Sequence, residues 1–182
     1  MSMEYNMGYV VGAGVGILFG IIFIAFFMKF TKKDGSMKCR FDERQNIIRG
    51  KGYKYAFFTL LIYNALDILS GSILAMYFER EVITFFGIIL AVVVYAAYAI
   101  WNEGYFSLNE NPKRVMILFG VVSVINLASG ITSIAEGSII EAGKVTFRAM
   151  NLLCGLMMLF ILGVLAVKNI SRNRAQERQD EE

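Results

Sequence analysis

Five long apolar segments constrain the fold of this chain more than any other feature. A helix needs about 20 mostly apolar residues to cross the hydrocarbon core of a bilayer, which is roughly 30 Å thick. Segments of this length lie at residues 8–28, 55–77, 82–101, 115–135 and 149–167. They lack the period-two alternation of barrel strands, and a backbone in lipid must pair its own polar groups. The sequence therefore predicts an all-α integral membrane protein with five transmembrane helices.

The connections between these segments are short, so little of the chain remains for a soluble domain. Hydrophobic residues make up 57% of the 182 residues, against about 45–50% in a typical soluble domain. We expect a single five-helix domain at residues 1–168, with a basic loop at 29–54 and a charged tail at 169–182. The first segment is expected to be a retained helix, because no lysine or arginine precedes it as in a signal peptide.

The distribution of basic residues predicts the orientation of the helices. Five alternating crossings place all but three of the 18 lysines and arginines on one side of the membrane. The exceptions are Arg80, Lys144 and Arg148. Because short cytoplasmic loops are enriched in lysine and arginine, we expect the N-terminus outside the cytosol and the C-terminus inside it.

Glycines recur at every fourth position of the first segment. They are Gly8, Gly12, Gly16 and Gly20. At this spacing they would form one smooth helix face, which lets another helix backbone approach closely. Glycine also lowers helix propensity, so such a series implies a compensating contact. Two interpretations remain: packing against the chain's own bundle, or association with a second copy or a partner membrane protein.

The basic loop before the second segment is predicted to contain a short helix. Asp42, with Gln45 three residues later, resembles a capping box that would start it. Gly50 and Gly52 would bend the chain into the second span. Four side chains would face anionic lipid headgroups at the cytoplasmic surface: Arg40, Arg44, Arg49 and Lys51. The alternative is an ordinary loop whose charges only fix the topology.

Part of this loop resembles a known motif. The string Asp42-Glu43-Arg44-Gln45, followed by Arg49-Gly50-Lys51, is similar to a juxtamembrane motif of small multipass membrane proteins of Gram-positive bacteria, a family of unknown function. The resemblance covers residues 41–58. It implies a bacterial plasma membrane, and it assigns no activity and no catalytic or binding residue.

Five polar side chains lie within or at the edges of the predicted spans: Asn64, Asp67, Asn126, Arg148 and Asn151. A charged group in mid-membrane costs at least about 2.5–3.5 kcal/mol unless it is paired or hydrated. We expect Asp67 to pair with Arg148, because both belong to the outer half of the membrane. Such a pair and the asparagines would either hold the helices together or form a polar site for a transported cation or proton.

The sequence offers little chemistry for catalysis. It has no histidine and only two cysteines, Cys39 and Cys154, which fall in different environments. The absence of histidine excludes HExxH zinc sites and a Ser-His-Asp triad. No nucleotide-binding glycine loop is present, and the basic excess is explained by topology. We therefore expect a non-enzymatic protein without cofactor, metal or nucleic-acid partner.

Two functions fit these features. The first is a non-enzymatic membrane protein that acts through helix–helix association, as an accessory, regulatory or immunity-type subunit. The second is a small oligomeric transporter or channel with a polar site around Asp67.

Overall fold

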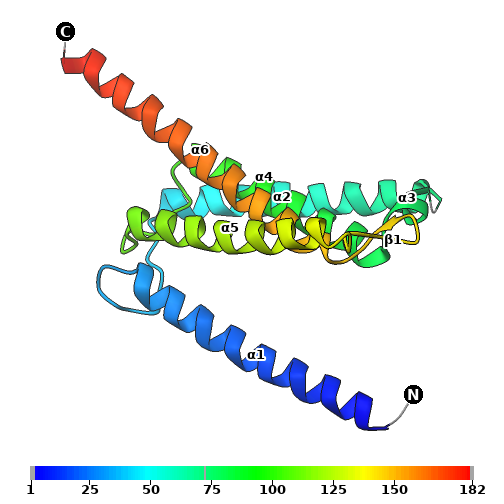
Figure 1. The fold of residues 1–182 in the computed structure, drawn as a ribbon. Helices are drawn as coiled ribbons and strands as arrows, with labels where there is room; N and C mark the ends of the chain where they lie inside the picture. The colour runs from blue at the N-terminus through cyan, green and yellow to red at the C-terminus, as the bar shows by residue number, and fades with distance from the viewer. Residues whose placement is uncertain (1–2, 72, 181–182) are drawn as a thin grey trace.

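The computed structural model describes residues 3–71 and 73–180, which are mostly helical (Figure 1). Its helices are α1 (Met3–Thr31), α2 (Glu43–Leu69), α3 (Ile73–Tyr77), α4 (Arg80–Trp101), α5 (Pro112–Ala135) and α6 (Ala149–Asp180). Two short strands, β1 (Ile140–Glu141) and β2 (Lys144–Val145), pair as an antiparallel hairpin between α5 and α6. The predicted all-α architecture is confirmed.

Four helices in the described chain are long and apolar enough to cross a membrane, by length and composition. The segments are Val10–Thr31, Arg80–Trp101, Pro112–Ala135 and Ala149–Glu177. They fit a multi-pass membrane protein, as the sequence predicts.

The predicted span at 55–77 is not one helix, which corrects the sequence interpretation. Helix α2 ends at Leu69, Ser70 caps it, and Gly71 adopts a left-handed backbone with φ of +59°. A helix cannot continue through that conformation, so the chain turns and α3 forms separately. The first half of α2 also carries several charged residues, and this helix is not among the four candidate spans.

The predicted start of α2 is confirmed, and the predicted bend is not. The Asp42 side chain accepts a hydrogen bond from the Gln45 backbone N–H at 2.6 Å, and the Gln45 side chain accepts one from the Asp42 N–H at 3.3 Å. Helix α2 then continues without interruption through Gly50 and Gly52. No separate interfacial helix therefore precedes it. Gly52 is buried against Tyr95, and a Cβ there would lie 3.0 Å from that ring.

The helices form a bundle from which α1 diverges. Helices α2, α4 and α5 and the first half of α6 run side by side, with the main contacts between α2 and α4, α4 and α6, and α5 and α6 (Figure 1). Helix α1 meets the bundle at its C-terminal end, where the Phe27 and Phe119 rings lie 6.4 Å apart, and then extends away from it.

The bundle has two chemically different ends. At the basic end, α1 and α4 finish and α2 and α5 begin, and the loops at 32–42 and 102–111 lie together (Figure 1). At the opposite end the β-hairpin contacts the start of α4: the Glu79 N–H donates to the Val145 carbonyl at 2.9 Å, and the Glu79 carboxylate accepts from the Phe147 N–H at 2.7 Å.

Small residues bring α5 and α6 together. A Cβ at Gly130 would lie 2.9 Å from Leu152 Cβ, and one at Gly155 would lie 2.7 Å from Leu127 Cγ. The buried Ser123 hydroxyl donates to the Gly155 carbonyl at 3.0 Å. This is the close backbone approach that small residues permit in membrane helices. In this chain it occurs between α5 and α6.

Candidate functional site

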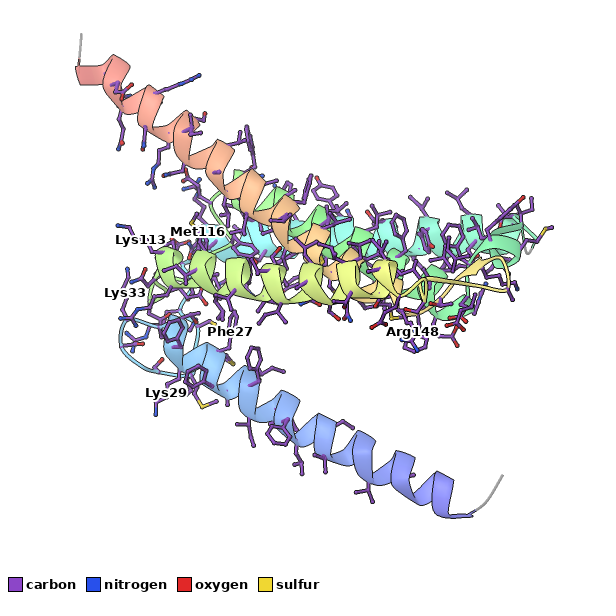
Figure 2. The ribbon with its side chains drawn as sticks, in the orientation of Figure 1. Phe27, Lys29, Lys33, Lys113, Met116 and Arg148 are labelled. Atoms are coloured by element: carbon purple, nitrogen blue, oxygen red, sulfur yellow. The ribbon has the colours of Figure 1, made fainter. Side chains whose placement is uncertain are left out.

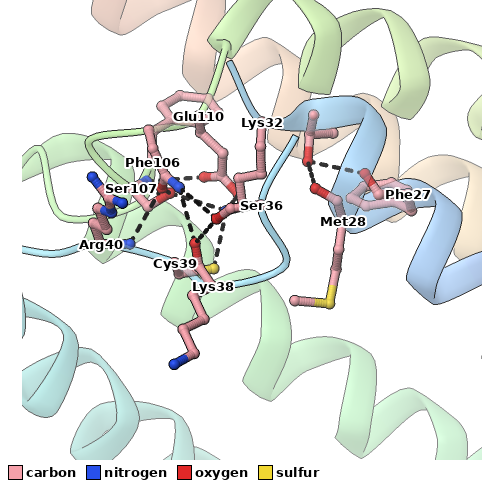
Figure 3. A network of polar contacts seen from close by, with 12 residues as sticks. Phe27, Met28, Lys32, Ser36, Lys38, Cys39, Arg40, Phe106, Ser107 and Glu110 are labelled. Carbon is pink, nitrogen blue, oxygen red and sulfur yellow. Dashed lines mark hydrogen bonds and ion pairs between the residues drawn. The ribbon is translucent and has the colours of Figure 1, made fainter. Parts of the chain in front are cut away.

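The basic end holds a buried polar network whose centre is Lys32. Its side chain is 1% exposed, although it follows an apolar helix directly. The ammonium group donates to Cys39 Sγ at 3.0 Å, Ser107 Oγ at 3.0 Å and Glu110 Oε1 at 2.7 Å (Figure 3). All three donor positions of the ammonium are thereby used. Lys32 thus joins the loop after α1 to the loop before α5.

Asn109 is the second centre of this network. Its amide nitrogen donates to the Lys38 carbonyl at 2.9 Å and to the Asp34 carboxylate at 3.2 Å. Its amide oxygen accepts from the Ser107 hydroxyl at 2.9 Å and from the Arg40 N–H at 3.2 Å. One buried side chain therefore fixes several points of the 32–42 loop.

Backbone hydrogen bonds join the same two loops. The Asn111 N–H donates to the Thr31 carbonyl, and the Lys33 N–H donates to the Asn109 carbonyl, each at 2.8 Å. The Arg114 guanidinium, in the first turn of α5, reaches the Phe30 carbonyl at 3.2 Å. The last carbonyls of α1 are thus satisfied by the bundle, which fastens the helix at this end.

The electrostatics of the network favour its charged forms. Burial opposes the charge on Lys32, but the hydrogen bonds that the ammonium donates to Cys39 and Glu110 outweigh it and raise its pKa. The Ser36 N–H, with the Asn109 amide, lowers the pKa of the Asp34 carboxyl. Favourable partners for an ionised form shift a pKa in these directions. Lys32 is therefore charged and Asp34 ionised at neutral pH.

The four predicted headgroup residues do not share one site. Arg40 lies 4.0 Å from Asp34, Arg44 lies 3.6 Å from Glu103, and Lys51 is exposed on α2. The Arg49 guanidinium lies 3.6 Å from the centroid of the Phe41 ring and donates to the Tyr53 and Tyr95 hydroxyls. Arg49 is thus engaged by aromatic side chains within the chain.

The expected ion pair between Asp67 and Arg148 is wrong. Asp67, whose side chain is 7% exposed, lies 2.9 Å from Arg80 at the start of α4, and Arg148 lies 3.9 Å from Glu141 in the hairpin. The turn after Leu69 explains the difference, because it brings the start of α4 back beside the end of α2.

Two of the three asparagine side chains in the predicted spans form hydrogen bonds within their own helices. The Asn64 and Asn126 side chains donate to carbonyls one turn earlier in their own helices, those of Leu60 at 2.7 Å and Val122 at 2.8 Å. Asn151 alone reaches another helix, donating to the Ser129 hydroxyl at 2.9 Å. The structure therefore does not bring these residues to Asp67.

The described glycines of the predicted face of α1 contact nothing in the bundle. A Cβ built at Gly12, Gly16 or Gly20 would have no heavy atom from elsewhere in the described chain within 4 Å. The surroundings of Gly8 lie outside the described part. Of the two interpretations of this face, packing against the chain's own bundle is therefore wrong for these three glycines.

Neither a protein-family model, nor a curated protein, nor a solved structure matches this chain. Within residues 3–71 and 73–180, no group of three or more acidic or cysteine side chains is placed to hold a metal ion. The function must therefore be inferred from the geometry.

Sequence reasoning missed the Lys32 network. In the sequence Lys32 is one of nine basic residues between positions 29 and 54, and nothing marks it as the buried one. Two of its three side-chain partners, Ser107 and Glu110, lie more than 70 positions away in a loop that carries no recognisable motif. Only the return of α4 to the basic end brings them together.

Proposed function

We propose that this protein is a non-enzymatic multi-pass membrane protein that acts by associating with another membrane helix through α1. It would serve as an accessory, regulatory or immunity-type subunit. The observation that carries this proposal is the exposure of α1. Its apolar segment is not buried by the rest of the described chain, and Gly12, Gly16 and Gly20 of its predicted contact face are open.

Glycine inside a helix costs about 0.8–1 kcal/mol relative to alanine. Gly12, Gly16 and Gly20 gain no packing within the chain that would offset this cost. A second helix placed against them would offset it, because close backbone approach is what such faces permit. Close approach at glycines already occurs within this chain, where Gly130 and Gly155 bring α5 and α6 together.

The Lys32 network supports this role by fixing how α1 is presented. The network holds the last turn of α1 by side-chain and backbone hydrogen bonds, whereas the rest of the helix projects from the bundle (Figures 1 and 3). A helix held at one end loses less freedom when a partner binds it, which favours association.

Five crossings with the N-terminus outside and the C-terminus cytoplasmic are part of the proposal. Helix α2 contributes a crossing because it starts at the basic end and finishes beside the start of α4, and Asp67 near its end pairs with Arg80. The basic end would face the cytosol. The resemblance of the Asp42–Lys51 stretch supports a bacterial plasma membrane as the location, with anionic lipids at that face.

The alternative of a transporter around Asp67 receives less support. The Asp67 carboxylate is engaged by Arg80 at 2.9 Å, and Asn64 and Asn126 bond to their own helices. These polar groups would therefore have to exchange their partners before binding a transported ion.

Affinity purification from the native membrane in mild detergent, with the native mass of the complex, tests the proposal. Gly12→Ile and Gly14→Ile are compared as single variants, because Gly14 lies on a different face of α1 and is equally open. A stoichiometric partner lost with Gly12→Ile and retained with Gly14→Ile would support an accessory subunit. A monomer without partner would refute the proposal. A pure homo-oligomer would favour the transport alternative, tested by liposome flux of Asp67→Asn.

A further inference from the structure

A cavity of about 900 Å³ opens at the basic end, next to the Lys32 network and apart from the glycine face. Its walls come from Lys33 in the loop after α1, the start of α2, the end of α4 with the 102–111 loop, the first turns of α5 and residues 165–172 of α6. This volume is within the range of small-molecule sites in proteins, roughly 300–1,000 Å³.

Positive charge dominates the walls of this cavity. Five basic side chains line it: Lys33, Arg44, Lys113, Lys168 and Arg172. They come from four separate segments of the chain, and Lys33 and Lys113 lie together at this end, opposite Arg148 (Figure 2). Among the described residues, two carboxylates line it, those of Asp42 and Glu103. The cavity thus carries three positive charges in excess.

The two carboxylates are already engaged. Glu103 lies 3.6 Å from Arg44 and 3.4 Å from Lys168, and Asp42 caps α2. Among the ion pairs of the described chain, none involves Lys33, Lys113 or Arg172. Three cations from different segments therefore line one cavity without an ion-pair partner among the described residues.

The inner part of the cavity is apolar. Ile100 and Leu165 line it and are 4% and 7% exposed, and Met116 packs beside them. At the rim, the Lys168 ammonium lies 5.8 Å from the centroid of the Trp101 ring. Trp101 itself lines a second groove of about 650 Å³ between α4 and α6, whose lining is almost entirely apolar. Basic and apolar surfaces therefore meet where these helices leave their apolar segments.

We propose that this cavity binds the phosphate group of an anionic phospholipid from the adjacent leaflet. Lysine and arginine bind phosphate oxygens through charge-assisted hydrogen bonds, and basic pockets between membrane helices hold anionic headgroups. The apolar lining favours an amphiphile over a free phosphate ion, because it offers a place for acyl chains. This site is independent of α1 association and does not rest on it.

Native mass spectrometry of the full chain in detergent tests the site with three probes. These are short-chain phosphatidylglycerol, short-chain phosphatidylcholine and glycerol 3-phosphate. A triple variant, Lys33→Gln/Lys113→Gln/Arg172→Gln, removes the unpaired cations. A matched triple, Lys38→Gln/Lys51→Gln/Arg174→Gln, removes the same charge from exposed positions outside the cavity.

We expect the wild type and the matched triple to bind phosphatidylglycerol equally and in preference to phosphatidylcholine. The cavity triple should bind phosphatidylglycerol about tenfold or more weakly, given the contribution of each basic side chain near an anionic headgroup. Equal losses in both triples, or no preference for the anionic lipid, would overturn the proposal. Glycerol 3-phosphate binding as tightly as the lipid would overturn the lipid as the source of the phosphate. Circular dichroism and thermal midpoints establish that both triples are folded.

Discussion

The Lys32 ammonium lies 2.7 Å from the Glu110 carboxylate and joins two segments 78 residues apart. The contact is shielded, with side-chain exposures of 1% for Lys32 and 18% for Glu110. It lies at the C-terminal end of α1, where this helix meets the bundle. The placement of α1 thus depends on this buried ion pair, the hydrogen bonds around it and the contact of Phe27 with Phe119.

Lys32→Met should destabilise the fold and loosen α1. The variant leaves Glu110 and Ser107 without their buried donor, and hydrogen bonds to charged groups contribute about 1.5–3 kcal/mol each. We expect a loss of about 2–4 kcal/mol in the free energy of unfolding, measured by unfolding in mixed micelles. The matched variant Lys38→Met removes an exposed lysine from the same loop and should change stability little. Equal stability of the two variants would contradict the structural role of Lys32.

The pH dependence of this network follows from its pKa shifts. Because the pKa of Lys32 is raised in the folded chain, its contribution is complete below the ordinary value of 10.5 and disappears as the pH rises through the raised value. The pKa of Asp34 is lowered, so its contribution is present above the ordinary value of 3.8 and disappears as the pH falls through the lowered value. Wild-type stability minus that of Lys32→Met should therefore stay constant from neutral pH to 10.5 and shrink as the pH rises through the raised pKa of Lys32. A decrease between neutral pH and 10.5 would refute this assignment.

Asp67 should be coupled to Arg80 and not to Arg148. A double-mutant cycle of Asp67→Asn with Arg80→Gln should give a coupling of about 0.5–1 kcal/mol, because the Arg80 side chain is largely exposed. The same cycle with Arg148→Gln should give no coupling, since Arg148 faces Glu141. Unfolding free energies in mixed micelles measure both cycles. Coupling to Arg148 alone would restore the pairing expected from the sequence.

Glycines of α5 and α6 should be more sensitive to substitution than those of α1. Gly155→Ala places a Cβ 2.7 Å from Leu127 Cγ and 3.1 Å from the Leu127 backbone nitrogen, so we expect a loss of about 1–3 kcal/mol in unfolding free energy. Gly16→Ala meets no atom of the bundle, and its better helix propensity should leave the isolated protein unchanged or stabilise it by up to about 1 kcal/mol. Equal destabilisation by both would show that α1 packs against its own bundle.

The basic end should be accessible only from the cytosol. In a Cys154→Ala background, a membrane-impermeant maleimide should label the exposed Cys39 only after the membrane is opened. Glu136 is exposed at the opposite end of the bundle. When Glu136→Cys is combined with Cys39→Ala in the same background, the new cysteine should be labelled in intact cells. Labelling of Cys39 in intact cells would reverse the proposed orientation.

The partners of side chains that pair over long sequence distances could not be predicted from the sequence, as Asp67 illustrates. Its need for a cationic partner follows from the energetics of charge in a membrane, so the expectation of an ion pair was sound. The identity of the partner depended on where the helix ends. The left-handed turn at Gly71 returns the chain early and brings Arg80, rather than Arg148, within 2.9 Å.

The sequence by itself determined the helical class, through apolar segments long enough to cross a bilayer. It also determined the start of α2, through the capping residues Asp42 and Gln45. These properties are local, because helix formation in lipid depends on segment length and on nearby hydrogen-bonding groups. Tertiary structure alone decided that Lys32 is buried, that Gly155 rather than Gly16 packs against a helix, and that the cations at the basic end surround one cavity. The physical reason is that each of these features depends on groups that helix packing brings together. The distance between such groups in space is not determined by residue type or by spacing along the chain.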